Sequence, residues 1–247
     1  METKETANLL RNLAQQYNTK DFIQNDPVQF PHKYTDKRDI EISAIISSWI
    51  AYGNRKQIIL TLNRLHTEFY DSPYCYIRNR RYVAHRHNEQ CLYRFYIYKD
   101  FYQLCETLYC IYISKQYPSM EDKLLSIQKE YTSCISLLEA LISLFPNQKG
   151  IPLNTTSACK RLCLLLRWLI RKDSIVDLGI WNLLPQSELL IPLDTHVFRM
   201  AKELNLTNRK QADMKTAVEI SNKLKEVFPD DPTLGDFALF GYGIDHK

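Results

Sequence analysis

The chain has 247 residues, of which 45% are hydrophobic and 24% charged, and its formal net charge is +4. These values fit a folded protein of one large domain or two closely packed lobes, and they allow a polyanionic partner without requiring one. The chain start lacks a charged-then-apolar signal region, and the densest apolar stretch, 162–170, is short and interrupted by Arg167. We therefore expect no membrane span and a cytoplasmic location.

The seven cysteines form an odd set without a Cys-x-x-Cys pair. Cys159 and Cys163 lie four residues apart, hence on one helical face, which is more typical of a core than of a metal site. We expect buried free thiols in a reducing compartment, and neither a metal nor another cofactor.

Secondary structure is expected to be helical throughout. Only 6 glycines occur, alternating strand patterns are nearly absent, and apolar residues recur at helical spacing, which predicts an all-α fold. Apolar residues over 40–50 mark a buried helix that ends near Gly53, another helix follows over 58–65, and Ser72-Pro73 begins the next. Further helices are predicted at about 122–145, 157–171, 195–205, 213–228 and 234–243.

The stretch 74–112 is rich in aromatic residues, interleaved in its first half with the basic groups 78–81 and 85–87. Such interleaving can form a stacking surface for single-stranded nucleic acid. A solvated helix face over an aromatic core has the same composition, and we favour that second interpretation.

Residues 191–199, IPLDTHVFR, combine three local signals. Pro192 holds the entering chain extended, Asp194 stands at an N-cap position, and an apolar stripe at helical spacing follows it. Taken alone, Asp194 could be a simple cap that contributes about 1 kcal/mol.

The whole string resembles the signature of the helix-hairpin-helix DNA glycosylase superfamily. The resemblance implies a two-lobed, all-α unit with a central cleft, with lobe one at about 36–135 and lobe two at about 1–35 plus 136–247. It also implies that Asp194 caps a helix at the mouth of the cleft and is the essential carboxylate. A fixed anion stabilises the positive charge that builds on the sugar as the N-glycosidic bond breaks, and it can orient or deprotonate an attacking water or amine.

Glycosylases of this superfamily that also cleave the strand use a lysine, which attacks the sugar C1′ as a neutral amine and forms a Schiff base. In the predicted helix 157–171, Lys160 begins a polar stripe with Leu164, Arg167 and Arg171, which is either a solvent line or a cleft lining. Under the resemblance we prefer Lys160 as the nucleophile. Lys172 is the competing candidate, although a lysine at a helix end usually satisfies the helix dipole.

The sequence departs from most of the superfamily before this helix. The usual Gly-rich hairpin is replaced by residues 148–156, which lack Gly-x-Gly, and Lys160 lies 34 residues ahead of Asp194. Both features look like the archaeal 8-oxoguanine glycosylase branch. The strings RWLIR (167–171) and DLGIW (177–181) resemble an uncharacterised bacterial family related to the superfamily.

The resemblance implies roles for further residues. Asp236 and Phe240 would hold the flipped base, with Leu164 lining the pocket, although an N-cap Asp followed by a core Phe would look the same. Asn54 and Arg55 would form a loop tip that enters the gap left by the base, although a plain helix C-cap explains the same residues. The hairpin residues Asn154, Thr156 and Ser157 would contact DNA through backbone amides. The side chains of Arg167 and His196 would supply the remaining DNA contacts.

These features predict a DNA glycosylase and β-lyase of base excision repair, which removes an oxidised base such as 8-oxoguanine. Its partner would be double-stranded DNA with a damaged base or an abasic site, and the protein would be a monomer. Two alternatives stay open: a non-catalytic binder of damaged or bent DNA with the same fold, and a helical protein-interaction module.

Overall fold

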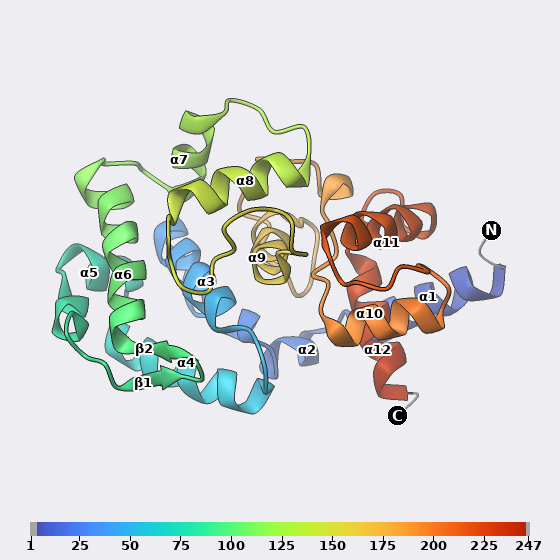
Figure 1. Cartoon of the computed structure of the whole chain (residues 1–247), viewed down its shortest axis with the longest axis horizontal. Helices are drawn as coiled ribbons and strands as arrows, with labels where there is room; N and C mark the ends of the chain where they lie inside the picture. The colour runs from blue at the N-terminus through green and yellow to red at the C-terminus, as the bar shows by residue number, and fades with distance from the viewer. Residues whose placement is uncertain (1–3, 246–247) are drawn as a thin grey trace. The chain divides into compact units, whose positions relative to one another are not determined.

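The computed structural model describes residues 4–245 and confirms the all-α class (Figure 1). Among these residues the strands are confined to one antiparallel hairpin, β1 (Cys91–Tyr93) and β2 (Tyr96–Ile97). None of the helices in the described part of the chain has the length and apolar content that crossing a bilayer requires.

The chain divides into two compact units. The central unit comprises Asn25–Glu130 and Glu139–Leu153, and the terminal unit comprises the described residues of Met1–Gln24, Tyr131–Leu138 and Asn154–Lys247. The two units exchange three segments relative to the expected lobes. Residues 25–35 and 139–153 belong to the central unit, and residues 131–135 belong to the terminal unit.

The central unit is a helical assembly around α3 (Lys37–Ile50), of which Asp39 to Ile50 are all buried. α5 packs against α3, α4 and α6. Side-chain caps set several helix starts: Asp36 caps α3, Asn54 caps α4, and Ser72 caps α5. Its other helical elements are η1 (Pro27–Gln29), η2 (Pro31–Lys33), α4 (Arg55–Phe69), α5 (Pro73–Arg78), η3 (Arg81–His85), α6 (Tyr98–Tyr109), the π-helical turn η4 (Cys110–Ser114) and α7 (Met120–Ile127).

The basic and aromatic stretch in this unit forms a core with a charged outer face. Phe69, Tyr76 and Phe101 are buried and lie within 6.5 Å of one another, measured between ring centroids. Arg78, Arg80 and Arg81 are exposed. Tyr76 and Phe101 therefore match the second interpretation, whereas Phe95 of the same stretch is exposed.

The predicted helix over 122–145 is wrong in its middle. α7 ends at Ile127, and α8 (Cys134–Leu144) begins after the intervening residues 128–133. The Ser133 hydroxyl accepts the Ser136 N–H at 3.2 Å, which starts a new helix, and Tyr131 is buried between the two. One boundary between the units, 130/131, falls at this break, and another, 138/139, falls within α8.

The terminal unit contains α1 (Lys4–Tyr17), α2 (Lys20–Gln24), α9 (Lys160–Ile170), η5 (Gln186–Glu188), α10 (Thr195–Glu203), α11 (Met214–Val227) and α12 (Leu234–Asp245). α12 packs against both α1 and α10 (Figure 1). An added Cβ at Gly241 of α12 would lie 2.2 Å from a ring carbon of Tyr17, so a glycine is needed where α1 crosses. Residues 162–170 of α9 are all buried, as is typical of a core helix.

The seven cysteines are free thiols. Cys105, Cys134, Cys159 and Cys163 are buried, as expected, but Cys91 and Cys110 are exposed. Burial raises the pKa of Cys105 well above its usual value, so this thiol stays neutral.

Candidate active site at Lys160 and Asp194

Asp194 caps α10, as the sequence predicts. Its backbone is extended, and Oδ1 accepts the N–H groups of His196 and Val197, both at 2.9 Å. The chain that leads to it is fixed by burial of residues 191–193 and by a hydrogen bond from Ile191 N–H to the Ser221 hydroxyl. Both capping bonds use Oδ1, and the side chain is 41% exposed.

Lys160 is the first residue of α9, and its side chain meets Asp194. The distance from Lys160 Nζ to Asp194 Oδ2 is 3.9 Å, and the lysine side chain is 29% exposed. Two helix starts that lie 34 residues apart in the sequence therefore bring an amine and a carboxylate together. The competing Lys172 is exposed, and its amine contacts Asn182 instead.

The geometry of this pair suits chemistry at a third atom. A separation of 3.9 Å is too long for a direct hydrogen bond, and an atom placed between the two groups could lie about 3 Å from each. Both groups are partly exposed, so a substrate can reach them. The arrangement can therefore present a nucleophile and an anion to one reacting carbon.

The residue before Lys160 is Cys159, whose thiol is the other possible nucleophile at this turn. Cys159 has a left-handed backbone with φ +48°, and its Sγ donates to the Ser157 carbonyl at 3.3 Å. Burial raises the pKa of Cys159, so its thiol stays neutral. The amine of Lys160, and not the adjacent sulfur, is thus the candidate nucleophile.

The expected hairpin residues Asn154, Thr156 and Ser157 are exposed and directly precede α9. The Thr156 N–H is already bonded to the Asn154 side chain at 2.9 Å, and the Thr156 carbonyl accepts the Met214 N–H. Ser157 forms a bridge with Asp213. The Thr156 amide therefore reaches a phosphate only if the Asn154 side chain releases it, whereas contact through the other two residues stays a prediction.

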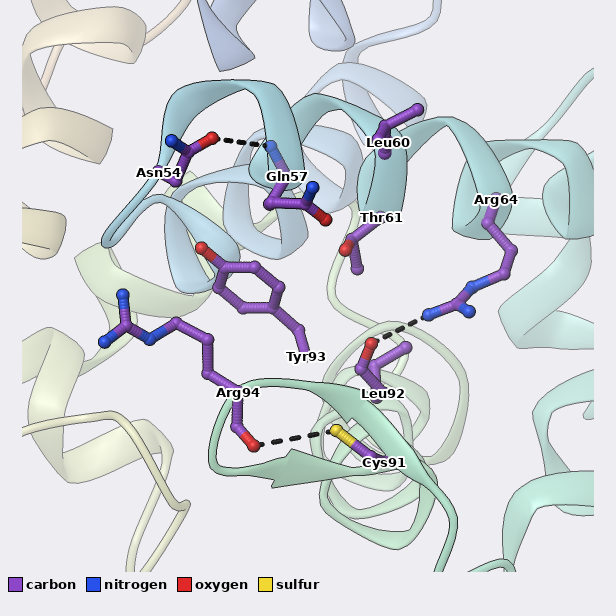
Figure 2. Close-up of a pocket in the computed structure, with 9 residues that line it drawn as sticks. All are labelled: Asn54, Gln57, Leu60, Thr61, Arg64, Cys91, Leu92, Tyr93 and Arg94. Carbon is purple, nitrogen blue, oxygen red and sulfur yellow. Dashed lines mark hydrogen bonds between the residues drawn. The ribbon is translucent and has the colours of Figure 1, made fainter.

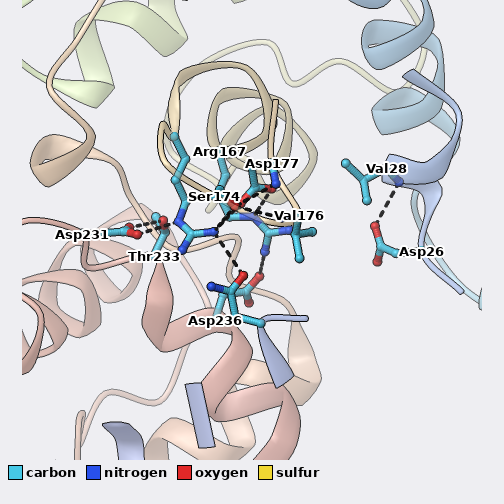
Figure 3. Close-up of polar contacts among 11 residues, drawn as sticks. Asp26, Val28, Arg167, Ser174, Val176, Asp177, Asp231, Thr233 and Asp236 are labelled. Atoms are coloured by element: carbon cyan, nitrogen blue, oxygen red, sulfur yellow. Dashed lines mark hydrogen bonds and ion pairs between the residues drawn. The ribbon is translucent and has the colours of Figure 1, made fainter. Parts of the chain in front are cut away.

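Beyond Lys160, the expected polar stripe of α9 faces neither solvent nor a cleft, because its two arginines are buried in ion pairs. Arg167 is 1% exposed, and its guanidinium pairs with Asp177 at 3.2 Å and with Asp236 (Figure 3). Arg171, also buried, pairs with Asp177 at 2.7 Å and with Asp231 at 2.5 Å. Because it is buried, Arg167 cannot contact DNA in this structure, which corrects that expectation.

The three residues expected around a flipped base lie in packed surroundings. Leu164 is buried. Asp236 is the third residue of α12, not its N-cap, and its carboxylate accepts a hydrogen bond from Arg167. The Phe240 ring packs edge-on against Tyr17 and Phe22, with centroids 5.9 and 5.4 Å away. Their contact with a base stays a prediction.

The remaining expected contacts have structural partners as well. Asn54 caps α4 by accepting the Gln57 N–H, and Arg55 lies 3.8 Å from Asp26. A Cβ at Gly243 would lie 2.2 Å from Nε2 of His196, so this ring faces α12. These contacts do not test the predicted roles of Asn54, Arg55 and His196 in DNA binding, which stay predictions.

The sequence contains a partial signal for this ion-pair network. Arg167, Arg171 and Asp177 all lie in the two strings compared with the bacterial family, but no role was attached to them. Their i, i+4 spacing showed that the two arginines share a face. Asp231 could not be found this way, because it lies 60 residues from Arg171.

Comparison with known families gives one match: the model of DUF2400, described as a protein of unknown function, covers residues 26–245. Neither the curated proteins nor the solved structures contain a match to the chain.

Proposed function

Since the chain belongs to the DUF2400 family, whose function is unknown, we propose a function from the site itself: a DNA glycosylase with β-lyase activity. Lys160 is the proposed nucleophile and Asp194 the proposed electrostatic carboxylate. The observation that carries the proposal is the 3.9 Å approach of Lys160 Nζ to Asp194 Oδ2 in a partly exposed site. The string over 191–199 supports the same reaction independently, because it resembles a glycosylase signature.

The proposed reaction begins at C1′ of the damaged nucleotide. As the bond from C1′ to the base breaks, its electron pair leaves with the base, and the positive charge left on the sugar lies beside the Asp194 carboxylate. The neutral amine of Lys160 attacks C1′, and Asp194 is placed to take, directly or through water, the proton that the new C–N bond releases. Cleavage of the C1′–O4′ bond, with protonation of O4′, then gives a Schiff base, and loss of a proton from C2′ to water expels the 3′ phosphate by β-elimination.

The substrate we propose is double-stranded DNA with an oxidised base or an abasic site, bound by a monomer in the cytoplasm. The net charge of +4 is compatible with this partner. We further propose that the helices belong to a two-lobed fold of the helix-hairpin-helix glycosylase type. Its support is the signature string and the helical build of both units.

Reductive trapping tests the nucleophile. Duplexes that contain 8-oxoguanine or an abasic site are incubated with the protein and borohydride, which reduces a Schiff base to a stable covalent adduct. We expect an adduct with the wild-type protein and with Lys172→Gln, and none with Lys160→Gln. An adduct that survives in Lys160→Gln would refute the assignment of the nucleophile.

A non-catalytic DNA binder is the second candidate, and the hairpin favours it. The Thr156 amide is bonded within the chain, and the Gly-x-Gly of an ordinary phosphate-binding hairpin is absent from the sequence. Tight binding to abasic or lesion-containing duplexes, without adduct formation or base release from any of them, would select this candidate over the enzyme.

A further inference from the structure

The central unit contains a pocket of about 410 Å³ between α4 and the β1–β2 hairpin (Figure 2). Gln57, Leu60, Thr61 and Arg64 form one wall, because their spacing places them on one face of α4. Asn54 lies at the end of that wall, and residues 91–94 of the hairpin form the other wall. This volume falls within the range of small-ligand sites.

The charged residues that line the pocket are both arginines. Arg64 and Arg94 line it, and no carboxylate is among the lining residues that the structure describes. Arg55 and Lys56 stand in the first turn of α4, which holds no acidic residue. A helix N-terminus adds a partial positive charge to these groups. An anionic ligand therefore fits the site.

One polar group faces the pocket without a hydrogen bond in the described part of the protein. Thr61 is 7% exposed and lines the pocket, and no residue from 4 to 245 bonds to its hydroxyl. The Gln57 side chain, which is exposed, points into the same space (Figure 2). The Thr61 hydroxyl and the Gln57 amide are open to the pocket, so a ligand atom can bond to them in place of water.

Aromatic groups at the rim suit a ligand with flat rings. Arg94, at φ +53°, holds its guanidinium 5.3 Å from the Tyr52 ring and 5.7 Å from the Phe95 ring. Phe95 follows at the hairpin tip with 71% of its surface exposed. An exposed ring beside an arginine is the kind of platform on which nucleic-acid bases stack.

We propose that this pocket holds one unpaired nucleotide of a DNA strand. The base lies against Leu60 and Leu92 and bonds to Thr61, and its phosphate lies on Arg94. The neighbouring base stacks on Phe95. This site goes beyond the proposed chemistry at Lys160, and it stands whether or not that lysine forms an adduct.

Cys91 reports on occupancy, because it is exposed and lines the pocket, whereas Cys110, also exposed, does not line it. The probe is a single-stranded 12-nucleotide oligothymidylate, and alkylation of each cysteine by iodoacetamide is followed by mass spectrometry. At ten times the dissociation constant, we expect Cys91 to react about tenfold more slowly while Cys110 keeps its rate. Unchanged alkylation of Cys91 by a demonstrably bound oligonucleotide would overturn the proposal.

Matched variants separate the pocket from charge alone. Thr61→Val keeps the shape and removes the hydroxyl, and Arg94→Gln removes the cation; each should weaken binding about tenfold. Arg86→Gln removes an exposed arginine outside the pocket and should change affinity much less. Equal protection of Cys91 in Thr61→Val would refute the bond between Thr61 and a base, and equal protection by inorganic phosphate at the same concentration would show that the pocket takes an anion and not a nucleotide.

Discussion

The two roles of Asp194 can be separated by two substitutions. Asparagine accepts N–H groups as well as aspartate does at a helix N-cap, whereas alanine cannot accept them. Asp194→Asn should therefore keep the two bonds from His196 and Val197 and lose only the negative charge. Asp194→Ala should lose both the cap and the charge.

The expected stability changes follow from those contacts. Losing the charge at the start of α10 costs about 0.5 kcal/mol through the helix dipole, and the ion pair with Lys160 adds little because both side chains are partly exposed. Losing the cap costs about 1 kcal/mol more. Urea unfolding should thus show a decrease of about 0.5 kcal/mol for Asp194→Asn and of about 1.5 kcal/mol for Asp194→Ala.

Catalysis should follow the charge and not the stability. Both variants lack the anion beside C1′, so cleavage at lesions or abasic sites should fall about 100-fold or more in each. The assay is single-turnover strand cleavage under conditions where both variants are folded. Wild-type cleavage by Asp194→Asn, with loss only in Asp194→Ala, would show that Asp194 is a cap and nothing more.

Three further predictions concern stability, and urea unfolding measures each. Arg167→Met should lower the free energy of unfolding by about 3–5 kcal/mol because it removes the buried cation that Asp177 and Asp236 share, whereas a loss below about 1 kcal/mol, the size expected for the exposed Lys172→Met, would contradict the network. Burial lowers the pKa of His66 to about 3 from its ordinary 6.5, so folding favours the neutral imidazole. The stability that the buried neutral ring contributes is therefore complete above pH 6.5 and is lost as the pH falls toward 3. The slope, up to about 1.4 kcal/mol per pH unit, should flatten in His66→Gln, and an unchanged slope would refute this account. Gly241→Ala should cost about 1–3 kcal/mol as its Cβ meets Tyr17, and a neutral result would show that α1 can shift.

The parts of the fold that sequence predicted are those with local signals. Ser72-Pro73 at the start of α5, Asp194 at the start of α10 and the apolar stripe after Asp194 each lie within a few residues of the helix that they define, whereas Asn54, considered as a helix C-cap, is the N-cap of α4. The break at 128–133 was missed because helical residues flank it on both sides. The hairpin at 91–97 was missed because Arg94 takes the left-handed position where a glycine or asparagine would have marked the turn.

Burial of the α9 arginines could not be inferred from α9 itself. The spacing of Lys160, Arg167 and Arg171 is the same whether their face meets water, a ligand or buried carboxylates. What decides the outcome is the position of Asp177, Asp231 and Asp236, which comes from the loop after α9 and from the region of α12. Contacts over 60 residues or more leave no periodic trace in a single sequence.

The same network constrains how the proposed site can work. α12 contacts α9 through the pairing of Asp236 with Arg167, and it contacts α10 through the packing of Gly243 on His196. α9 and α10, which begin at Lys160 and directly after Asp194, therefore contact one common helix, and these contacts support the separation of the two side chains. Asp236 is already bonded to a buried cation, so a contact between it and a flipped base would have to share or break that pair. A base contact through Asp236 would thus weaken the support that positions the lysine, and support of α9 is the role that its observed bond to Arg167 favours.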